Sequence, residues 1–138
     1  MKNIFYPEKA KAKILLIDDE EDICVYLKAV LERTKKFEVF TSTQPIEGVF
    51  LAKKVHPDLI VLDILMPGMD GTQVAQYLQE DITTKDIPVL FLTVLVRREE
   101  VRLSKGLIGG HPFIAKPVET EELIARIEVM LQKECPAN

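Results

Sequence analysis

The residues of this chain that could do chemistry stand at the ends of short apolar runs. They are Asp18, Asp19, Asp63, Thr93 and Lys116. A carboxylate placed directly after Leu-Ile-Val-Leu is desolvated unless a partner meets it. Asp63 cannot cap the next helix, because that helix is expected to begin only at about residue 72. We therefore interpret Asp63 as a functional residue.

The three aspartates have one structural and one functional interpretation. Asp18 and Asp19 could cap the following helix and complement its dipole, which would explain one of them well and the second poorly. If both lie near Asp63, each pair about 4 Å apart repels by about 4 kcal/mol at an effective dielectric constant of about 20. A cation would relieve this repulsion. Oxygen ligands without a histidine or cysteine cluster suit Mg²⁺, so we predict a Mg²⁺ site.

Lys116 and Thr93 each keep two interpretations. Lys116 could form a structural salt bridge to Asp63 or bind a substrate anion, and both can hold at different times. Thr93 could be an ordinary β-branched strand residue, or its hydroxyl could donate to a phosphoryl oxygen. Together with a carboxylate and a divalent cation, these groups would form a phosphoryl-transfer site. Asp63 would then be the nucleophile that forms an acyl phosphate.

The elements that must position these residues follow from the hydrophobic pattern. Short apolar, β-prone runs alternate with segments of helical spacing, which predicts a parallel sheet with helices on both faces. Five such units match a flavodoxin-like, doubly wound (βα)5 three-layer sandwich with strand order 2-1-3-4-5, in which ligands bind beyond the carboxyl ends of the first and third strands. The expected strands are 13–17, 37–41, 59–63, 88–93 and 113–116, and the expected helices run from Ile23 to Leu31 and over about 45–55, 72–79, 97–105 and 118–133.

Composition limits the class of protein. The 138 residues fit one domain, which we place at 12–134 with an N-terminal extension at 1–11 and a tail at 135–138. No apolar run is long enough to span a membrane or to form a signal peptide. The net charge is −4 and the basic residues are scattered, so we expect no direct binding of nucleic acid. These features predict a cytoplasmic domain.

These motifs together resemble the response-regulator receiver domains of two-component signalling, the CheY-like family. The resemblance covers about residues 12 to 134, and its motifs occur in order at the expected strand ends. The matching segments are Asp18-Asp19 after Ile-Leu-Leu-Ile, Asp63 in Leu-Ile-Val-Leu-Asp-Ile-Leu-Met-Pro-Gly-Met-Asp-Gly, Thr93, and Phe-Ile-Ala-Lys-Pro at 113–117.

The resemblance implies a role for each site residue. It implies that Asp63 accepts a phosphoryl group from a sensor histidine kinase or a phosphotransfer protein, so that the chain is a signalling phosphoacceptor and not an enzyme. It implies that Asp19, Asp63 and the backbone carbonyl of Leu65 ligate Mg²⁺ directly, with Asp18 acting partly through water. It implies that Lys116 pairs with the phosphoryl group.

The resemblance also implies a switch. Thr93 would move to bind the phosphoryl group, and the ring of Phe113 would turn inward. Pro67 and Gly68 would shape the loop that presents the Leu65 carbonyl, or form an ordinary turn, and the Lys116–Pro117 bond would be cis. The face over about residues 97–133 would control a downstream protein or an output domain outside this chain, and could form a homodimer.

The chain departs from the family pattern around the predicted phosphoryl group. Val94 stands where a small residue is common, and Leu65 and Leu95 are apolar where some members carry polar residues that assist attacking water. We expect these side chains to restrict access and to slow self-dephosphorylation. The alternative to a phosphorylation switch is a pseudo-receiver, a constitutive interaction module that is not phosphorylated.

Overall fold

Strands and helices alternate along the chain, as the hydrophobic pattern predicts. The computed structural model describes residues 10–94 and 107–134, so the helix expected at 97–105 lies outside the described residues. The strands are β1 (Ala12–Ile17), β2 (Phe37–Ser42), β3 (Leu59–Asp63), β4 (Val89–Thr93), β5 (Leu107–Ile108) and β6 (His111–Ala115). The described helices are α1 (Glu21–Arg33), α2 (Pro45–Val55), α3 (Gly71–Glu80) and α5 (Thr120–Glu134).

The sheet has the order β2-β1-β3-β4-β6-β5. The five predicted strands correspond to β1, β2, β3, β4 and β6, and they pair in parallel in the predicted order, which confirms the flavodoxin-like fold. The two-residue strand β5 was not expected. It pairs antiparallel with β6 across a turn at Gly109 and Gly110, both at positive φ. Two residues are too few to show a strand pattern in the sequence.

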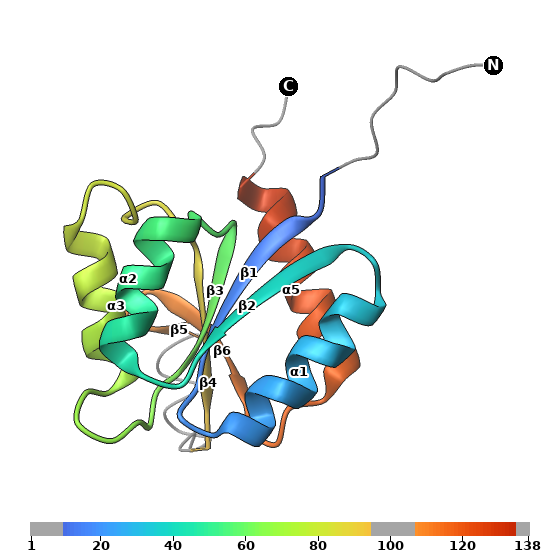
Figure 1. The fold of residues 1–138 in the computed structure, drawn as a ribbon, viewed down its shortest axis with the longest axis horizontal. Coiled ribbons are helices and arrows are strands. Elements are labelled where there is room, and N and C mark those ends of the chain that lie inside the picture. The colour runs from blue at the N-terminus through green and yellow to red at the C-terminus, as the bar shows by residue number, and fades with distance from the viewer. Residues whose placement is uncertain (1–9, 95–106, 135–138) are drawn as a thin grey trace.

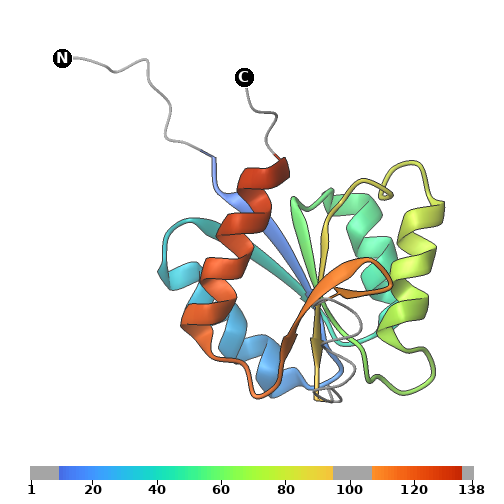
Figure 2. The ribbon, with the colours of Figure 1, turned by 180° about the vertical axis from the view of Figure 1, so that it is seen from behind.

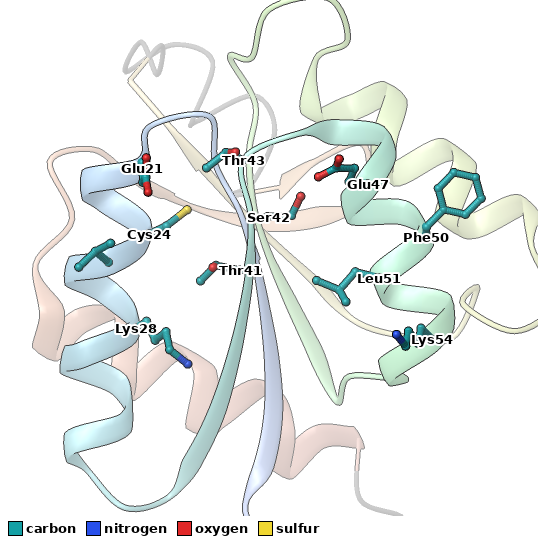
Figure 3. A pocket seen from close by; sticks show the side chains of 11 residues that line it. Glu21, Cys24, Lys28, Thr41, Ser42, Thr43, Glu47, Phe50, Leu51 and Lys54 are labelled. Atoms are coloured by element: carbon teal, nitrogen blue, oxygen red, sulfur yellow. The ribbon is translucent and has the colours of Figure 1, made fainter.

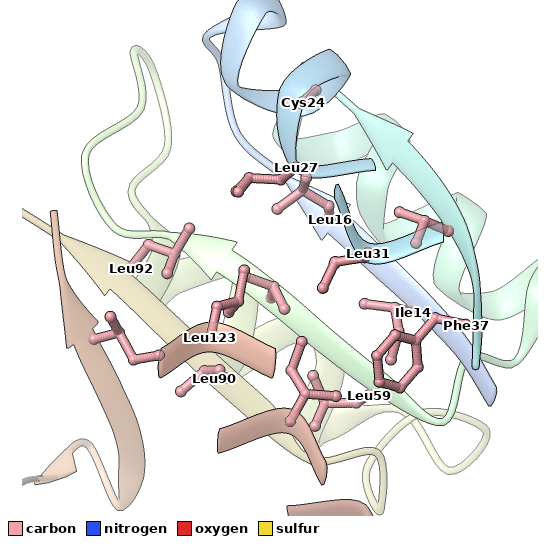
Figure 4. Close-up of a cluster of buried hydrophobic side chains, with 14 residues drawn as sticks. Ile14, Leu16, Cys24, Leu27, Leu31, Phe37, Leu59, Leu90, Leu92 and Leu123 are labelled. Atoms are coloured by element: carbon pink, nitrogen blue, oxygen red, sulfur yellow. The ribbon is translucent and has the colours of Figure 1, made fainter. Parts of the chain in front are cut away.

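Helices cover both faces of the sheet (Figure 1), and the view from behind shows the same layers (Figure 2). α1 and α5 lie on one face, and α2 and α3 lie on the other. Alternate residues of β1 pack into the two hydrophobic cores on opposite faces of the sheet. Ile14 and Leu16 belong to the cluster under α1 and α5 (Figure 4). Leu15 and Ile17 belong to the cluster under α2 and α3. All four side chains are fully buried, which is why this run is continuously apolar.

Local signals set the helix ends. α2 begins with Pro45 at its first turn and ends at His56, which adopts the left-handed conformation. Asp70 caps α3: its side chain accepts from the Gln73 N–H, and the Gln73 side chain accepts from the Asp70 N–H. At α1 the N-cap is Glu20, without a side-chain cap bond, so the capping interpretation of the two aspartates before it is wrong.

The described helices are short or amphipathic. Within residues 10–94 and 107–134, none is both long enough and apolar enough to cross a membrane. The fold instead brings the carboxyl ends of β1, β3, β4 and β6 to one edge of the sheet, because these strands run in the same direction.

Candidate functional site

The predicted site residues meet at the carboxyl edge of the sheet. Asp18 follows β1, and Asp63 ends the neighbouring strand β3, where Leu62 pairs with Ile17. One carboxylate oxygen from each of Asp18, Asp19 and Asp63 lies within 4.8 Å of the other two. Asp18 and Asp63 are both buried. The sheet therefore holds the carboxylates of Asp18 and Asp63 together in the protein interior.

Lys116 is the cation of this cluster. Its Nζ lies 2.9 Å from Oδ2 of Asp18, 3.4 Å from Oδ2 of Asp63 and 3.4 Å from Oε1 of Glu20. The Lys116 backbone N–H donates to the carbonyl of Thr93 at 2.8 Å, which fixes the start of the side chain against the end of β4. Burial lowers the pKa of Lys116, but the hydrogen bonds and charges of Asp18 and Asp63 together outweigh burial, so the pKa is raised.

Asp18 is held at every polar group. Its N–H donates to the Ser42 carbonyl at 3.1 Å, and its carbonyl accepts from Sγ of Cys24 at 3.3 Å. Its Oδ1 accepts from the Glu20 N–H at 2.9 Å. Burial, followed by the nearby charge of Asp18, raises the pKa of the Cys24 thiol to about 11, so this thiol stays a proton donor.

The surroundings of Asp63 disfavour its charged form. Burial, followed by the charge of Asp18, raises the pKa of Asp63 to about 6, although Lys116 and the Leu65 N–H lower it in part. The Leu65 N–H donates to Oδ1 of Asp63 at 3.3 Å. One ammonium group therefore does not balance the buried carboxylates. A divalent cation bound by carboxylate oxygens would do so, and the donor set fits Mg²⁺.

The loop after β3 approaches Asp63 closely. Gly71 donates its N–H to the Ile64 carbonyl at 2.7 Å, and a Cβ at Gly71 would clash with the backbone carbonyl of Asp63. Gly68 has a φ of 85°, which favours glycine. Pro67 and Leu65 are exposed in the same loop. Glycine at 71 is therefore needed for the path of the chain beside Asp63.

The other predicted residues lie around this edge. Thr93 is buried at the end of β4, and the Lys116–Pro117 bond is cis. Phe113 is half-buried opposite Phe91 of β4. Val94 is 57% exposed and shares a hollow of about 450 Å³ with Lys116 and Pro117. Leu95 lies outside the described residues.

Sequence reasoning missed the residues that support Asp18. Glu20, Cys24 and Ser42 contact it only through the turn into α1 and the pairing of β1 with β2. Glu20 belongs to an acidic run that gave no sign of an ion pair with a residue near the opposite end of the chain. Cys24 also belongs to the hydrophobic core cluster under α1 and α5. The close approach of Gly71 is signalled only by its place in the turn before α3.

The family model for the response regulator receiver domain matches residues 14–128. The chain therefore belongs to the response regulator receiver domain family of two-component signalling. Receiver domains are signalling phosphoacceptors rather than classical enzymes, and they bind Mg²⁺ at an acidic pocket. They interact with histidine kinases and with output domains. The aspartate cluster of this chain could hold such a metal.

Individual relatives agree with the family. The chain is 36% identical over 121 residues to the DNA-binding dual master transcriptional regulator RpaA of Synechocystis sp., covering 88% of this chain and 49% of RpaA. It is 34% identical to the phosphate regulon transcriptional regulatory protein PhoB of Rhizobium meliloti, covering 90% of this chain and 54% of PhoB. The chain thus spans about half the length of these relatives.

A solved structure matches the whole described fold. The response regulator from Desulfuromonas acetoxidans superposes with a TM-score of 0.76 at 31% sequence identity, covering 90% of this chain and 99% of that one. The likeness extends over nearly all of both chains. It agrees with the strand order and with the two-sided helix layers described above.

Proposed function

We propose that the chain is a phosphorylation-switched receiver that accepts a phosphoryl group on Asp63 from a sensor histidine kinase or a phosphotransfer protein. The observation that carries this proposal is the convergence of Asp18, Asp19, Asp63 and Lys116 at one sheet edge, with Lys116 3.4 Å from Asp63. A structural ion pair needs one carboxylate, whereas this edge holds several. Their excess negative charge suits a metal-assisted transfer of an anionic group.

In this proposal a carboxylate oxygen of Asp63 attacks the phosphorus of a phosphohistidine. The phosphorus–nitrogen bond breaks, its electron pair returns to the imidazole, and an acyl phosphate forms on Asp63. Asp19, Asp63 and the Leu65 carbonyl would hold Mg²⁺ directly, with Asp18 acting partly through water. When bound, this cation supplies positive charge against the phosphoryl oxygens.

Lys116 and Thr93 would then change partners. Lys116 already contacts Asp63, so it can pair with a phosphoryl oxygen there with a small movement. The Thr93 hydroxyl would donate to another phosphoryl oxygen, and Phe113 would turn inward beside it. These movements would alter the face that includes β6 and α5, through which a downstream protein, an output domain or a second copy would be controlled.

The test is phosphorylation by a small donor. Purified protein is treated with acetyl phosphate and Mg²⁺, and its intact mass is measured. We expect the added mass of one phosphoryl group, lost with a chelator and lost in Asp63→Asn. Asp86→Asn, an exposed aspartate away from the site, is the matched control and keeps the added mass. No added mass from acetyl phosphate or from any histidine kinase would support the pseudo-receiver instead.

A further inference from the structure

A hollow of about 570 Å³ lies between α1 and α2 (Figure 3), and Asp63 is not among the residues that line it. Thr41, Ser42 and Thr43, at the end of β2, line it between the two helices. β2 is the outermost strand on this side of the sheet. The hollow therefore gives access to the outer edge of a strand.

The backbone groups of β2 alternate between the two edges of the strand. The Ser42 carbonyl accepts from the Asp18 N–H, so Ser42 faces the β1 side. Neighbouring residues in a strand direct their N–H and C=O groups to opposite edges. Val39 and Thr41, separated from Ser42 by an odd number of positions, therefore direct theirs to the outer edge.

The outer groups of Val39 are already bonded to α1. The Val39 N–H donates to Oε2 of Glu32 at 3.0 Å, and Nζ of Lys28 donates to the Val39 carbonyl at 2.7 Å. Lys28 and Glu32 also pair with each other at 3.0 Å. The hydrogen bond from Val39 lowers the pKa of Glu32. These two side chains thus take the place of a neighbouring strand at Val39 and block pairing there.

The outer groups of Thr41 have no such cover. Among residues 10–94 and 107–134, neither helix offers Thr41 a side-chain hydrogen bond. Its N–H and C=O point to the side on which the hollow lies. A second extended backbone is the ligand that satisfies one donor and one acceptor on a strand edge. The outer edge of β2 is therefore open at Thr41, which lies inside the hollow.

The two helices line the hollow with the same order of residue types. Each helix contributes a glutamate, two successive apolar residues and a lysine at helical spacing. In α1 the buried cysteine is counted as one of the small apolar residues. Both glutamates lie toward the carboxyl edge of the sheet and both lysines toward the other end (Figure 3). The residues are Glu21, Cys24, Val25 and Lys28 of α1, and Glu47, Phe50, Leu51 and Lys54 of α2.

These walls are available for binding. Val25 and Phe50 are 63% and 64% exposed. Glu21, Glu47 and Lys54 take part in no ion pair within the described part of the chain. An occupant that offers a cation to the glutamates, an anion to Lys54 and apolar side chains to the middle would match the hollow along its length.

We propose that this hollow is a docking groove for an extended segment of a partner protein, which pairs antiparallel with β2 at Thr41. Glu47 and Lys54 are seven positions apart, about 10 Å along the helix axis, which equals about three residues of extended chain. The partner segment therefore carries a basic residue, two apolar residues and an acidic residue, in that order from its N-terminus. The antiparallel direction places the basic residue against Glu21 and Glu47.

The test measures the anisotropy of a fluorescent peptide with a Lys-Val-Phe-Glu core flanked by threonine and serine. The protein is unphosphorylated and free of Mg²⁺, so the result is independent of the function proposed for Asp63. A peptide with the two charged residues exchanged, Glu-Val-Phe-Lys, should bind at least about tenfold more weakly, because its charges meet like charges. Equal binding of the two peptides, or no binding of either, overturns the proposal.

Two sets of variants locate the peptide. Thr41→Pro removes the outward N–H without removing a bond to β1, and proline is tolerated on an edge strand in this orientation. It should lose binding, whereas Thr41→Val should keep it, with circular dichroism melting showing that both are folded. Glu47→Lys combined with Lys54→Glu should abolish the preference between the two peptides, because Glu21 and Lys28 of α1 keep the original charges. Unchanged affinity in Thr41→Pro, or an unchanged preference in the charge exchange, also overturns the proposal.

Discussion

The ammonium group of Lys116 lies 2.9 Å from Oδ2 of Asp18, and both side chains are almost fully buried. Asp63, the proposed phosphoacceptor, is the more distant partner at 3.4 Å. Before phosphorylation, Lys116 therefore neutralises mainly the aspartate that follows β1. It remains close enough to Asp63 to pair with a group added there.

Removing this ammonium group should destabilise the protein. In Lys116→Met we expect the free energy of unfolding at pH 8, in a chelator, to fall by about 3 kcal/mol, because Asp18 and Asp63 are left buried without a cation. Denaturant unfolding monitored by circular dichroism measures it. Lys36→Met removes an exposed pair with Glu128 and should cost less than about 1 kcal/mol. Equal costs in the two variants would contradict a buried, charge-balancing role for Lys116.

The raised pKa of Asp63 predicts a pH dependence of stability. Without Mg²⁺, the folded state holds a proton on Asp63 up to about pH 6, whereas the unfolded state loses it near 3.8. The free energy of unfolding therefore falls as the pH rises through this window, by about 3 kcal/mol from this group.

Asp63→Asn should remove that contribution. Relative to the wild type, the variant should gain stability between pH 4 and pH 7 in a chelator, because its side chain stays neutral. Thermal melts across this range measure the difference between the two proteins. Adding Mg²⁺ should stabilise the wild type and should have a smaller effect on the variant. A difference that is constant with pH would show that Asp63 titrates normally.

Gly71 should be intolerant of a side chain. In Gly71→Ala the new Cβ meets the Asp63 carbonyl and the Cα of Ile64, both backbone atoms that cannot move aside easily. We expect a loss of about 2 kcal/mol in the free energy of unfolding and slower phosphorylation by acetyl phosphate. Gly68→Asn is the matched variant in the same loop: nothing lies within 4 Å of its Cβ, and asparagine tolerates positive φ. A smaller loss in Gly71→Ala than in Gly68→Asn would contradict the close approach.

Val94 should prolong the phosphorylated state, given the proposed function. Its exposed side chain shares a hollow with Lys116, and we expect it to restrict the approach of water to a phosphoryl group on Asp63. We expect Val94→Ala to shorten the acyl-phosphate lifetime roughly fivefold, about 1 kcal/mol in the barrier to hydrolysis. Decay of the phosphorylated mass measures it, with Val129→Ala, exposed on α5, as the control. Equal lifetimes for Val94→Ala and the wild type would contradict the role.

Much of the fold can be predicted from short-range patterns in the sequence. The runs Ile14–Ile17 and Leu59–Leu62 are apolar on both faces because helices cover both sides of the sheet, so they are readable as buried parallel strands. Pro45 and the His56-Pro57 pair mark both ends of α2, whose predicted bounds agree with the structure. β5 was not predicted, because the extended conformation of its two residues depends on their pairing with β6.

The sequence alone predicts the strand–helix alternation and the position of Asp18, Asp63, Thr93 and Lys116 at strand ends, because hydrophobic periodicity and strand direction are local properties. Tertiary packing sets the closer pairing of Lys116 with Asp18 than with Asp63. It also sets where the cover of the β2 edge ends, between Val39 and Thr41. Contacts between residues 98 positions apart, such as Lys116 and Asp18, are set by how strands and helices pack. No local pattern encodes the distances that such packing leaves between side chains.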